Sequence, residues 1–266
     1  MRGMPGRRLD ATSLAGVPIA LGVVLVAQVL EGGSVRSLWQ PTAALIVFGG
    51  TCGAVLVSFS LGAVVRTVAA LRDAFGTPHD DIEPLVKRLV GYAMESRRRG
   101  ILALEPHLER MAEGFLRNAL TLAVDGTNPK TARQILDIEN QAHRAVAEIP
   151  ADVLETAAGY TPTLGILGAV LGLIHVMESL SEPTKLGTGI AVAFVATVYG
   201  VGAANLVLLP LATKLRSRAR HEGLYREVII EGVVALQEGL NPRLIEQKLR
   251  SYVTPSRTAP REQRAA

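Results

Sequence analysis

Charged side chains are unevenly distributed along the chain, and their absence marks four long apolar stretches. Stretches without Asp, Glu, Lys or Arg cover 20 residues after Asp10, 29 after Arg36, 22 after Glu155 and 28 after Lys185. A helix needs about 20 predominantly apolar residues to cross a bilayer, and a charge at its centre costs roughly 2.5–3.5 kcal/mol on insertion scales. The pattern therefore predicts four transmembrane helices, near residues 14–31, 41–62, 161–180 and 187–211.

The polar stretches show helical periodicity. Asn128-Pro129 and Asn241-Pro242 are typical of an N-cap followed by proline in the first turn, and Gly100 and Gly126 are predicted breaks. Residues 228–236 and 244–249 predict a short helical pair, and the polar residues 254–266 are expected to be disordered. Apolar residues recur every three or four positions in three stripes: Ile82, Leu85, Val86, Leu89, Val90 and Ala93; Leu108, Met111, Ala112, Phe115, Leu116 and Ala119; and Ile135, Ile138, Ala142, Ala145, Val146 and Ile149.

These patterns predict an all-α membrane protein with a helical cytoplasmic domain, since sustained strand alternation is absent. The expected layout is an N-terminal stub, two spans, a helical loop, two more spans, a helical tail and a disordered end. The corresponding residues are 1–13, 14–62, 63–160, 161–211, 212–253 and 254–266.

Lys and Arg residues predict the orientation of the chain. The stub holds three, the loop twelve and the chain after Ala212 eleven, whereas the connectors 31–40 and 181–186 hold one each. Because positive residues remain on the cytoplasmic side, both termini and the loop are expected there. A cleaved secretory signal also begins with basic residues, but this apolar run is long for one and leads through a Gly-Gly turn to the next. We therefore expect it to be retained.

Composition changes this picture little. The net charge of +4 and the pI near 9.5 follow from the basic ends and loop, so they do not call for nucleic-acid binding. A single cysteine excludes an internal disulfide and a multi-cysteine metal cluster. We see no nucleotide-binding loop or nucleophile constellation, so neither an enzyme nor a cofactor is expected. The loop carries twelve basic and fourteen acidic residues, which suits either a solvated helical domain or a charge-complementary partner.

Small residues recur at helical spacing within the apolar runs. Such spacing lets helices approach closely in lipid, either within one chain or between subunits. The third run contains Gly165, Gly168 and Gly172, the fourth Ala196, Gly200 and Ala204, and the second Gly49 and Gly53.

The apolar runs carry no ionisable group at mid-span. Their polar residues are Thr51, Ser58, Thr163, His175, Thr197, Tyr199 and Asn205. Thr197 and Tyr199 are expected near the middle of the fourth span, and Pro162 at the start of the third. A proton-conducting protein normally places an ionisable residue inside the membrane. If ions cross here, a titrating carboxylate must come from another polypeptide, and the chain is half of a channel.

Several motifs resemble those of flagellar motor stator proteins in the MotA/TolQ/ExbB proton channel family. The most specific is Arg97-Arg98-Arg99-Gly100-Ile101-Leu102-Ala103-Leu104-Glu105, which is similar to the family's Arg-Lys-x-Gly-x-Leu-Ala-Leu-Glu stretch. The arrangement of two spans, a loop and two spans also matches, so the resemblance covers residues 10–253. Further matches are Val124-Asp125-Gly126, Pro162-Thr163-Leu164-Gly165, Leu171–Met177, Val195–Gly200 and Asn241-Pro242-Arg243.

The resemblance implies partners and a location. It implies a homo-oligomeric ring of these chains in the bacterial inner membrane, among lipids, around a dimer of a B-type stator subunit. That partner would supply a transmembrane aspartate and a peptidoglycan-binding domain. Arg97, Arg98 and Glu105 match residues that engage the switch protein of the rotor, with Arg98 at the usual lysine position. Without the resemblance, the arginine run would be interpreted as a solvated face.

The resemblance also implies an ion pathway, in which the partner's aspartate is protonated beside Thr197, Tyr199 and the Pro162 end of the third span. Pro162 and Pro210 match prolines linked to coupling ion flow with movement of the loop, although prolines at helix ends are otherwise ordinary terminators. Sodium-driven members tend to carry threonine seven residues after the first of these prolines, where this chain has Ala169. Alanine lacks a hydroxyl that could coordinate a dehydrated cation, so protons are favoured. Thr197 matches a threonine of both classes and does not discriminate.

Two other functions are compatible with parts of the pattern. A TolQ/ExbB-type energiser of envelope processes has three spans, so the fourth apolar run and the Arg97–Glu105 motif argue against it. A self-contained secondary transporter would need an ionisable residue or substrate site at mid-membrane, and neither is visible in this sequence.

Overall fold

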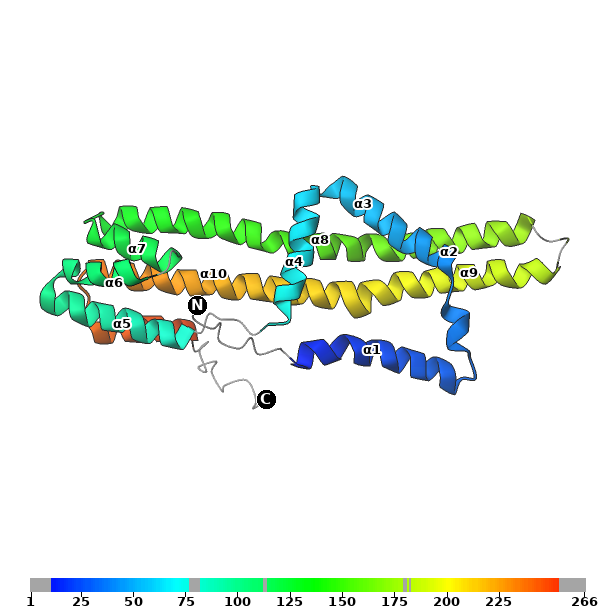
Figure 1. Ribbon diagram of the computed structural model, residues 1–266, viewed down its shortest axis with the longest axis horizontal. Helices are drawn as coiled ribbons and strands as arrows, with labels where there is room; N and C mark the ends of the chain where they lie inside the picture. Colours follow the sequence, from blue (N-terminus) through cyan, green and yellow to red (C-terminus); the bar gives the residue numbers. More distant parts are fainter. Residues whose placement is uncertain (1–10, 77–81, 112–113, 179–180, 182, 254–266) are drawn as a thin grey trace, which may run out of the picture. The chain divides into compact units, whose positions relative to one another are not determined.

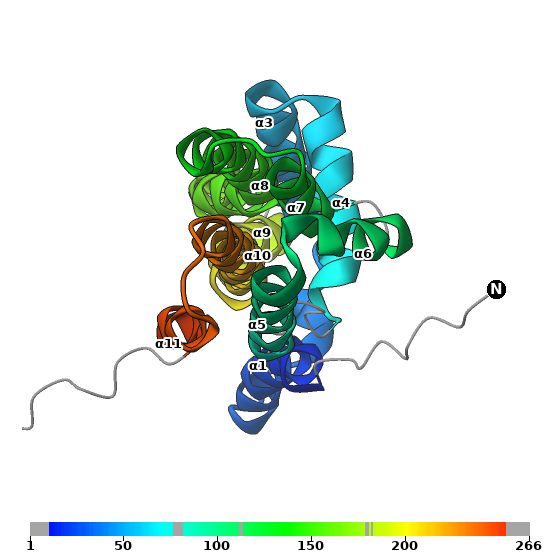
Figure 2. The same ribbon diagram turned by 90° about the vertical axis from the view of Figure 1, so that its left-hand side faces the viewer.

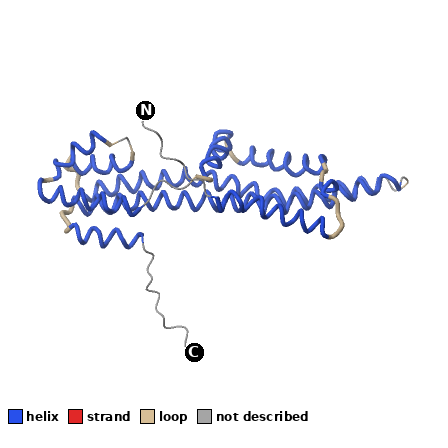
Figure 3. The backbone as a smooth tube through the Cα atoms, turned by 60° about the horizontal axis from the view of Figure 1, so that its bottom comes forward, coloured by secondary structure: helices blue, strands red, loops and turns tan. Residues whose placement is uncertain are grey.

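The computed structural model describes residues 11–76, 82–111, 114–178, 181 and 183–253. Within these ranges the chain forms helices and short turns and contains no β-strand (Figure 3). The predicted all-α class is therefore confirmed. Residues 1–10 of the predicted stub and the tail 254–266 lie outside the described residues.

The chain forms two compact units. The first, which we call the membrane unit, comprises Met1–Thr77 and Glu148–Arg218; the second, the polar unit, comprises Pro78–Ala147 and Ala219–Ala266. Helices α8 (Pro129–Glu178) and α10 (Leu209–Gln237) contribute residues to both units. The segment 63–160, expected to form one loop domain, is thus shared between them.

The second apolar run does not form one regular helix. It is divided into a short helix, a π-helical segment and a third piece that ends at Ser58, because Phe59 is extended and Ser60 caps the next helix through a hydrogen bond from Ala63 N. The expected helix over 41–62 therefore ends four residues early. The elements of this half are α1 (Ala11–Leu30), η1 (Val35–Leu38), α2 (Pro41–Ala44), η2 (Leu45–Gly49), α3 (Gly50–Ser58) and α4 (Leu61–Ala74).

The third and fourth apolar runs are parts of much longer helices. The third lies within α8, and the fourth comprises α9 (Pro183–Gly202) and the π-helical segment η4 (Ala203–Leu208), which leads directly into α10. Among the described residues, three helical stretches are long and apolar enough to span a membrane: Pro41–Ser58, Pro129–Glu178 and Leu186–Gln237. The described apolar part of α1, Ala15–Leu30, is shorter, so its crossing of the membrane stays a prediction.

The membrane unit has several small packing clusters instead of one core. Ala43 and Val47 pack against Val195 and Ala196 of α9. Ala74 packs with Ala151, Leu154, Ala212 and Leu215, and Val55 packs with Ala63, Val153 and Ala157. Many large apolar side chains are exposed, including Ile19, Ile166 and Phe194. Exposed apolar side chains are expected on helices that face lipid rather than water.

The polar unit has one continuous hydrophobic core around the end of α10. Residues Val228–Leu236 are all buried, Glu231 included. A helix buried on every side occupies the centre of a domain, and Figure 2 shows the other helices of this unit around it. They are α5 (Ile82–Arg99), η3 (Ile101–Leu104), α6 (Glu105–Arg110), α7 (Phe115–Val124), the first part of α8, and α11 (Pro242–Val253).

Only part of the predicted periodicity describes the packing. The stripe that begins at Ile82 is buried as expected. The prediction that the stripe beginning at Leu108 belongs to one helix is wrong, because α6 ends at Arg110 and α7 begins at Phe115. The third stripe lies on an exposed face: Ile135 and Ile138 are exposed, whereas Leu136 is fully buried.

The predicted helix boundaries around asparagine and glycine are confirmed. Asn128 Oδ1 accepts a hydrogen bond from Lys130 N at 3.0 Å, and Asn241 Oδ1 accepts one from Arg243 N at 3.0 Å. Gly100 and Gly126 adopt φ angles of 85° and 72°. This left-handed region favours glycine because it has no Cβ, so both residues can end a helix where other residues would be strained.

Candidate functional site

The contact between α8 and α9 is made by glycine. These helices run side by side in the membrane unit (Figure 1). A Cβ atom on Gly165 would lie 2.9 Å from the Ala196 carbonyl oxygen, and one on Gly200 would lie 2.9 Å from the Thr161 carbonyl oxygen. Backbone therefore meets backbone at this crossing, which is the packing that small residues permit in lipid.

The close approach continues toward the turn between the two helices. A Cβ on Gly168 would lie 2.8 Å from Ala196 Cβ, and one on Gly172 would lie 2.8 Å from Ala193 N. Gly189 belongs to the same contact, since its Cβ would lie 3.0 Å from the Gly172 carbonyl oxygen. The sequence motifs missed Gly189 because it lies outside the fourth run's Ala-Gly-Ala spacing.

The glycines singled out in the second apolar run do not serve this purpose. A Cβ on Gly53 would have nothing within 4 Å, and one on Gly49 would meet only Leu45 of its own segment. The neighbouring Gly50 faces Leu164 of α8, whose side chain would lie 3.1 Å from an added Cβ. The one-residue difference follows from the π-helical segment η2, which rotates the residues after it relative to a regular helix.

Both candidate prolines lie in places that the sequence did not anticipate. Pro162 is inside the 50-residue helix α8, and Pro210 lies just after the start of α10, behind η4. The expectation of helix ends at these residues is wrong, because helix continues on both sides of each. A proline inside a helix removes a backbone hydrogen bond and crowds the carbonyl four residues earlier. For Pro210 that carbonyl belongs to Leu206 of η4, so the proline and the π-helical segment form one irregular region.

Pro162 is also part of the glycine contact. A Cβ on Gly200 would lie 3.2 Å from Pro162 Cα. Any bend of α8 at Pro162 therefore acts directly on α9, because no side chain separates the two backbones. Ala169, which the resemblance linked to ion choice, is half-buried two turns further along α8.

Thr197 and Tyr199 point in different directions, as expected for residues two apart on a helix. Thr197 is exposed, and its hydroxyl donates to the Ala193 carbonyl at 3.2 Å. Tyr199 is half-buried, and its hydroxyl donates to the Leu38 carbonyl and accepts from Gln40 N at 3.4 Å. Tyr199 thus ties α9 to the turn before α2, whereas Thr197 faces outward from this chain.

Two threonines connect α3 with α8 and were not singled out together from the sequence. The hydroxyl oxygens of Thr51 and Thr161 lie 3.4 Å apart, and both residues are buried. Each hydroxyl donates to the carbonyl four residues earlier, Thr51 to Val47 at 2.6 Å and Thr161 to Ala157 at 2.5 Å. The positions of threonines along the sequence do not show which of them meet between two helices.

Arg97, Arg98 and Glu105 surround one sharp turn of the polar unit. The arginines end α5, Gly100 reverses the chain, and Glu105 begins α6. All three charged side chains are exposed, and among the described residues none has an ion-pair partner. Leu104, fully buried, anchors the turn in the core. The turn therefore presents free charges of both signs on a fixed backbone.

A polar contact that the sequence motifs did not reveal closes the base of this turn. His107 Nε2 lies 2.9 Å from Glu95 Oε2, which joins α6 to α5. The ring of Tyr92 packs on the ring of His107 with centroids 5.4 Å apart. Burial raises the pKa of the Tyr92 hydroxyl, so it remains protonated at neutral pH. Because Glu95 and His107 lie twelve residues apart across a glycine reversal, helical spacing could not pair them.

Arg216 and Arg218 join α10 to neighbouring helices of the membrane unit. Arg216 donates to Asp152 at 2.8 Å and also to Glu155 on α8. The hydrogen bond from Arg216 lowers the pKa of the Glu155 carboxyl, and the hydrogen bonds that Arg216 donates to Glu155 and Asp152 raise its own pKa. Arg218 donates to the backbone carbonyls of Asp73, in the last turn of α4, and of Gly76, just after α4. One short stretch of α10 thus contacts both α8 and the chain after α4.

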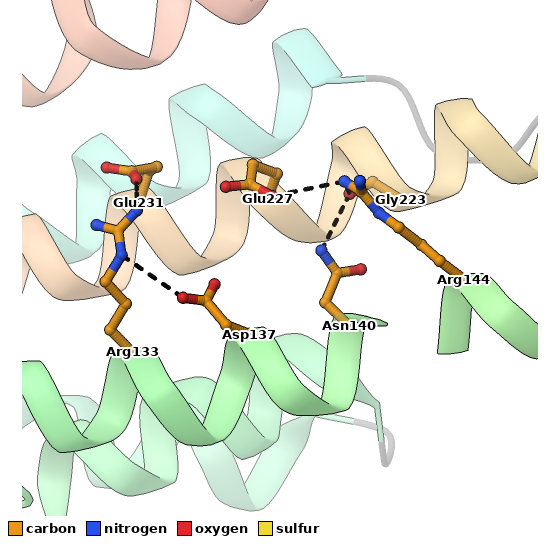
Figure 4. A network of polar contacts seen from close by, with 7 residues as sticks. All are labelled: Arg133, Asp137, Asn140, Arg144, Gly223, Glu227 and Glu231. Atoms are coloured by element: carbon orange, nitrogen blue, oxygen red, sulfur yellow. Dashed lines mark hydrogen bonds and ion pairs between the residues drawn. The ribbon is translucent and has the colours of Figure 1, made fainter. Parts of the chain in front are cut away.

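A second polar network joins α8 to α10 inside the polar unit (Figure 4). Glu231 is buried and accepts hydrogen bonds from Arg133 and, at 2.5 Å, from Lys248 of α11. Burial opposes its ionisation, but the hydrogen bonds from Lys248 and Arg133 outweigh that effect and lower the pKa of the carboxyl. About two turns before Glu231 on α10, the Gly223 carbonyl accepts a hydrogen bond from Arg144 at 2.9 Å.

Known proteins resemble the chain over nearly its whole length. The profile of the MotA/TolQ/ExbB proton channel family matches residues 107–228, and that of the Motility protein A N-terminal domain matches residues 14–92. Motility protein A of Bacillus subtilis is 37% identical over 92% of this chain and 91% of its own. Chemotaxis protein PomA of Vibrio alginolyticus is 32% identical over 94% of this chain and 98% of its own.

Solved structures agree with these sequence relatives. The structure of C. jejuni MotAB superimposes with a TM-score of 0.86 at 27% identity, covering 96% of this chain and 100% of that one. The flagellar MotAB stator complex of Bacillus subtilis superimposes with a TM-score of 0.85 at 37% identity, covering 92% and 97%. These relatives belong to a channel family rather than an enzyme family. The chain is a membrane protein of the MotA/TolQ/ExbB proton channel family.

Proposed function

We propose that this chain is the A-type subunit of a flagellar stator, and that with a B-type subunit it forms an ion channel that drives rotation of the motor. The observation that carries the proposal is the likeness of almost the whole chain to the MotAB stator complex. Its apolar runs lack an ionisable group at mid-span, so a channel needs a partner to supply one. A B-type subunit with a transmembrane aspartate and a peptidoglycan-binding domain fills that role.

The assembly we propose is a ring of these chains around the partner in the bacterial inner membrane. The distribution of Lys and Arg supports cytoplasmic termini and a cytoplasmic polar unit. The exposed Thr197 is available to a partner helix because its own chain leaves it uncovered. The tight contact of α8 and α9 around Pro162 gives a route by which a change at the partner carboxylate moves both helices together.

Protons are the ion that the pathway favours. Ala169 offers no hydroxyl for a dehydrated cation, and protonation neutralises the partner's aspartate without any coordination by this chain. Moving one charge through 100 mV releases about 2.3 kcal/mol, so each step does little work. Neutralising the aspartate beside Thr197 and Pro162 would change the contact between the ring and its partner and so advance the ring by one position.

A deletion strain tests the function and the ion together. Cells that lack this chain should build flagella but not swim, and a plasmid copy should restore swimming. The restored cells should swim equally well in sodium and potassium media and stop when a protonophore is added. Tracking of single cells measures both results. Full motility of the deletion strain without a second stator set would refute the function; sodium-dependent speed would refute only the choice of ion.

Charge reversal at the Gly100 turn tests the rotor contact. Arg97→Glu should lower swimming speed to less than about half, because a like charge placed against the partner costs several kcal/mol at a complementary interface. Lys87→Glu is the matched control: Lys87 is also exposed on α5 but lies ten residues, about 15 Å, before Arg97. Equal speeds of the two variants, at equal protein levels, would remove Arg97 from the rotor contact.

A further inference from the structure

The membrane unit contains an apolar cavity of about 690 Å³. One wall is α1, with Leu21 and Leu25, and the opposite wall is the second apolar run, with Phe48 and Cys52. Its floor consists of α8 and the stretch Val198–Leu208 of α9 and η4. Trp39, which follows η1, also lines it and is 78% exposed.

The cavity offers almost nothing to a polar ligand. Its lining includes no charged residue, and its hydroxyl groups already donate hydrogen bonds within the chain. The Thr51 hydroxyl donates to Val47, that of Thr161 to Ala157, and that of Tyr199 to Leu38. An unsatisfied polar group in hydrocarbon costs several kcal/mol. The occupant must therefore be apolar where it lies inside.

We propose that the cavity binds the acyl chain of a membrane lipid. In a bilayer the medium around such an opening is hydrocarbon, which offers no hydrogen-bonding groups, and a flexible acyl chain can follow the uneven apolar lining. Trp39 marks the mouth, since tryptophan favours the level of lipid headgroups, and the exposed Arg36 lies in the same turn.

The position of this site connects it with the coupling region. Its floor includes Thr161, which precedes Pro162, and Ala203 and Leu206 of the π-helical segment before Pro210. A bound chain would fill the space into which these irregular stretches of helix can move. This consequence depends on the proposed stator function, but binding of the lipid does not.

Two glycines provide a matched pair of variants. Gly202 lines the cavity, and a Cβ there would meet no atom within 4 Å, so Gly202→Leu adds a side chain at the cavity lining without a clash at its Cβ. Gly53 lies in the second apolar run, and a Cβ there would likewise meet nothing within 4 Å, but Gly53 does not line the cavity. Gly53→Leu therefore controls for the added side chain. Cys52→Leu fills the cavity from the opposite wall and serves if Gly202→Leu fails to assemble.

The only tryptophan of the chain reports on occupancy. The complex with its B-type subunit, whose tryptophans are replaced by phenylalanine, is purified with phosphatidylglycerol brominated on its acyl chains and then mixed with excess unbrominated vesicles. Brominated acyl chains quench the fluorescence of Trp39, so the fluorescence recovers as brominated lipid dissociates. We expect a slow phase of recovery in the wild type and in Gly53→Leu, and its loss in Gly202→Leu and Cys52→Leu.

Each outcome of this exchange experiment decides the proposal. A slow phase that persists in both cavity-filling variants would overturn it, and so would its absence from the wild type. Wild-type Trp39 that brominated lipid never quenches would show that protein covers the cavity, which also overturns the proposal. Because the measurement uses purified complex and needs no motility, failure of lipid binding is distinguishable from failure of the stator function.

Discussion

Replacing Gly200 with valine should abolish swimming. The Cβ atom would lie 2.9 Å from the Thr161 carbonyl oxygen and 3.0 Å from Gly165 Cα, and both are backbone atoms of α8. Overpacking a well-packed site costs about 1–3 kcal/mol when side chains can adjust, but here only separation of the two helices relieves the clash. Separation would disturb the contact along its length, including Pro162.

Swimming on soft agar, with immunoblots of membrane fractions, measures this effect. Gly53→Val is the control, because the same side chain is added to a membrane segment where nothing lies within 4 Å. We expect the control strain to swim. Normal swimming of Gly200→Val, or equal losses in both strains, would show that the close approach of α8 and α9 is not required.

Loss of the buried carboxylate should destabilise the polar unit. Glu231→Gln removes the charge that Arg133 and Lys248 share, and hydrogen bonds to charged groups contribute about 1.5–3 kcal/mol each. Both basic side chains are partly exposed and can regain water, so we expect a net loss of about 2 kcal/mol. Chemical denaturation of the purified complex, with unfolding monitored as the loss of protease resistance, measures this change in the free energy of unfolding.

The contribution of Glu231 to the stability of the fold should be lost at acidic pH only. Its folded-state pKa lies below the ordinary value of 4.5, so its contribution is fully present above about pH 4.5 and disappears as the pH falls through the folded-state pKa. The difference in Tm between wild type and Glu231→Gln should therefore be constant from pH 8 to 5 and shrink below pH 4.5. Glu246→Gln, which removes only a surface pair with Arg250, should show little difference throughout. A wild-type advantage that persists at pH 3 would contradict this assignment.

Features that depend on neighbouring residues in the chain were predictable. Asparagine followed by proline marks the start of α8 and of α11, because the cap and the first turn are made by adjacent residues. Gly100 marks the turn between Arg97 and Glu105 because a left-handed backbone favours glycine. The apolar runs were visible because a bilayer excludes charge over the whole length of a span.

Features that depend on which helix lies opposite were not predictable. Ile135 and Leu136 are both apolar, yet only Leu136 is buried, since the first part of α8 packs with that face toward the core of the polar unit. Likewise, Gly50 rather than Gly53 meets α8, because a π-helical segment shifts the face by a fraction of a turn. Periodicity describes one helix at a time and contains no information on its neighbours.

The sequence alone was sufficient for the all-helical class, the charge-free runs with no ionisable group at mid-span, and the charges around Gly100, because each follows from composition over a short stretch. The tertiary structure was required to place Pro162 inside the backbone contact of α8 and α9, to pair Glu95 with His107, to bind Tyr199 to the turn before α2 and to bury Glu231 between two cations. These contacts join residues from different helices, and their partners are selected by how the helices pack together.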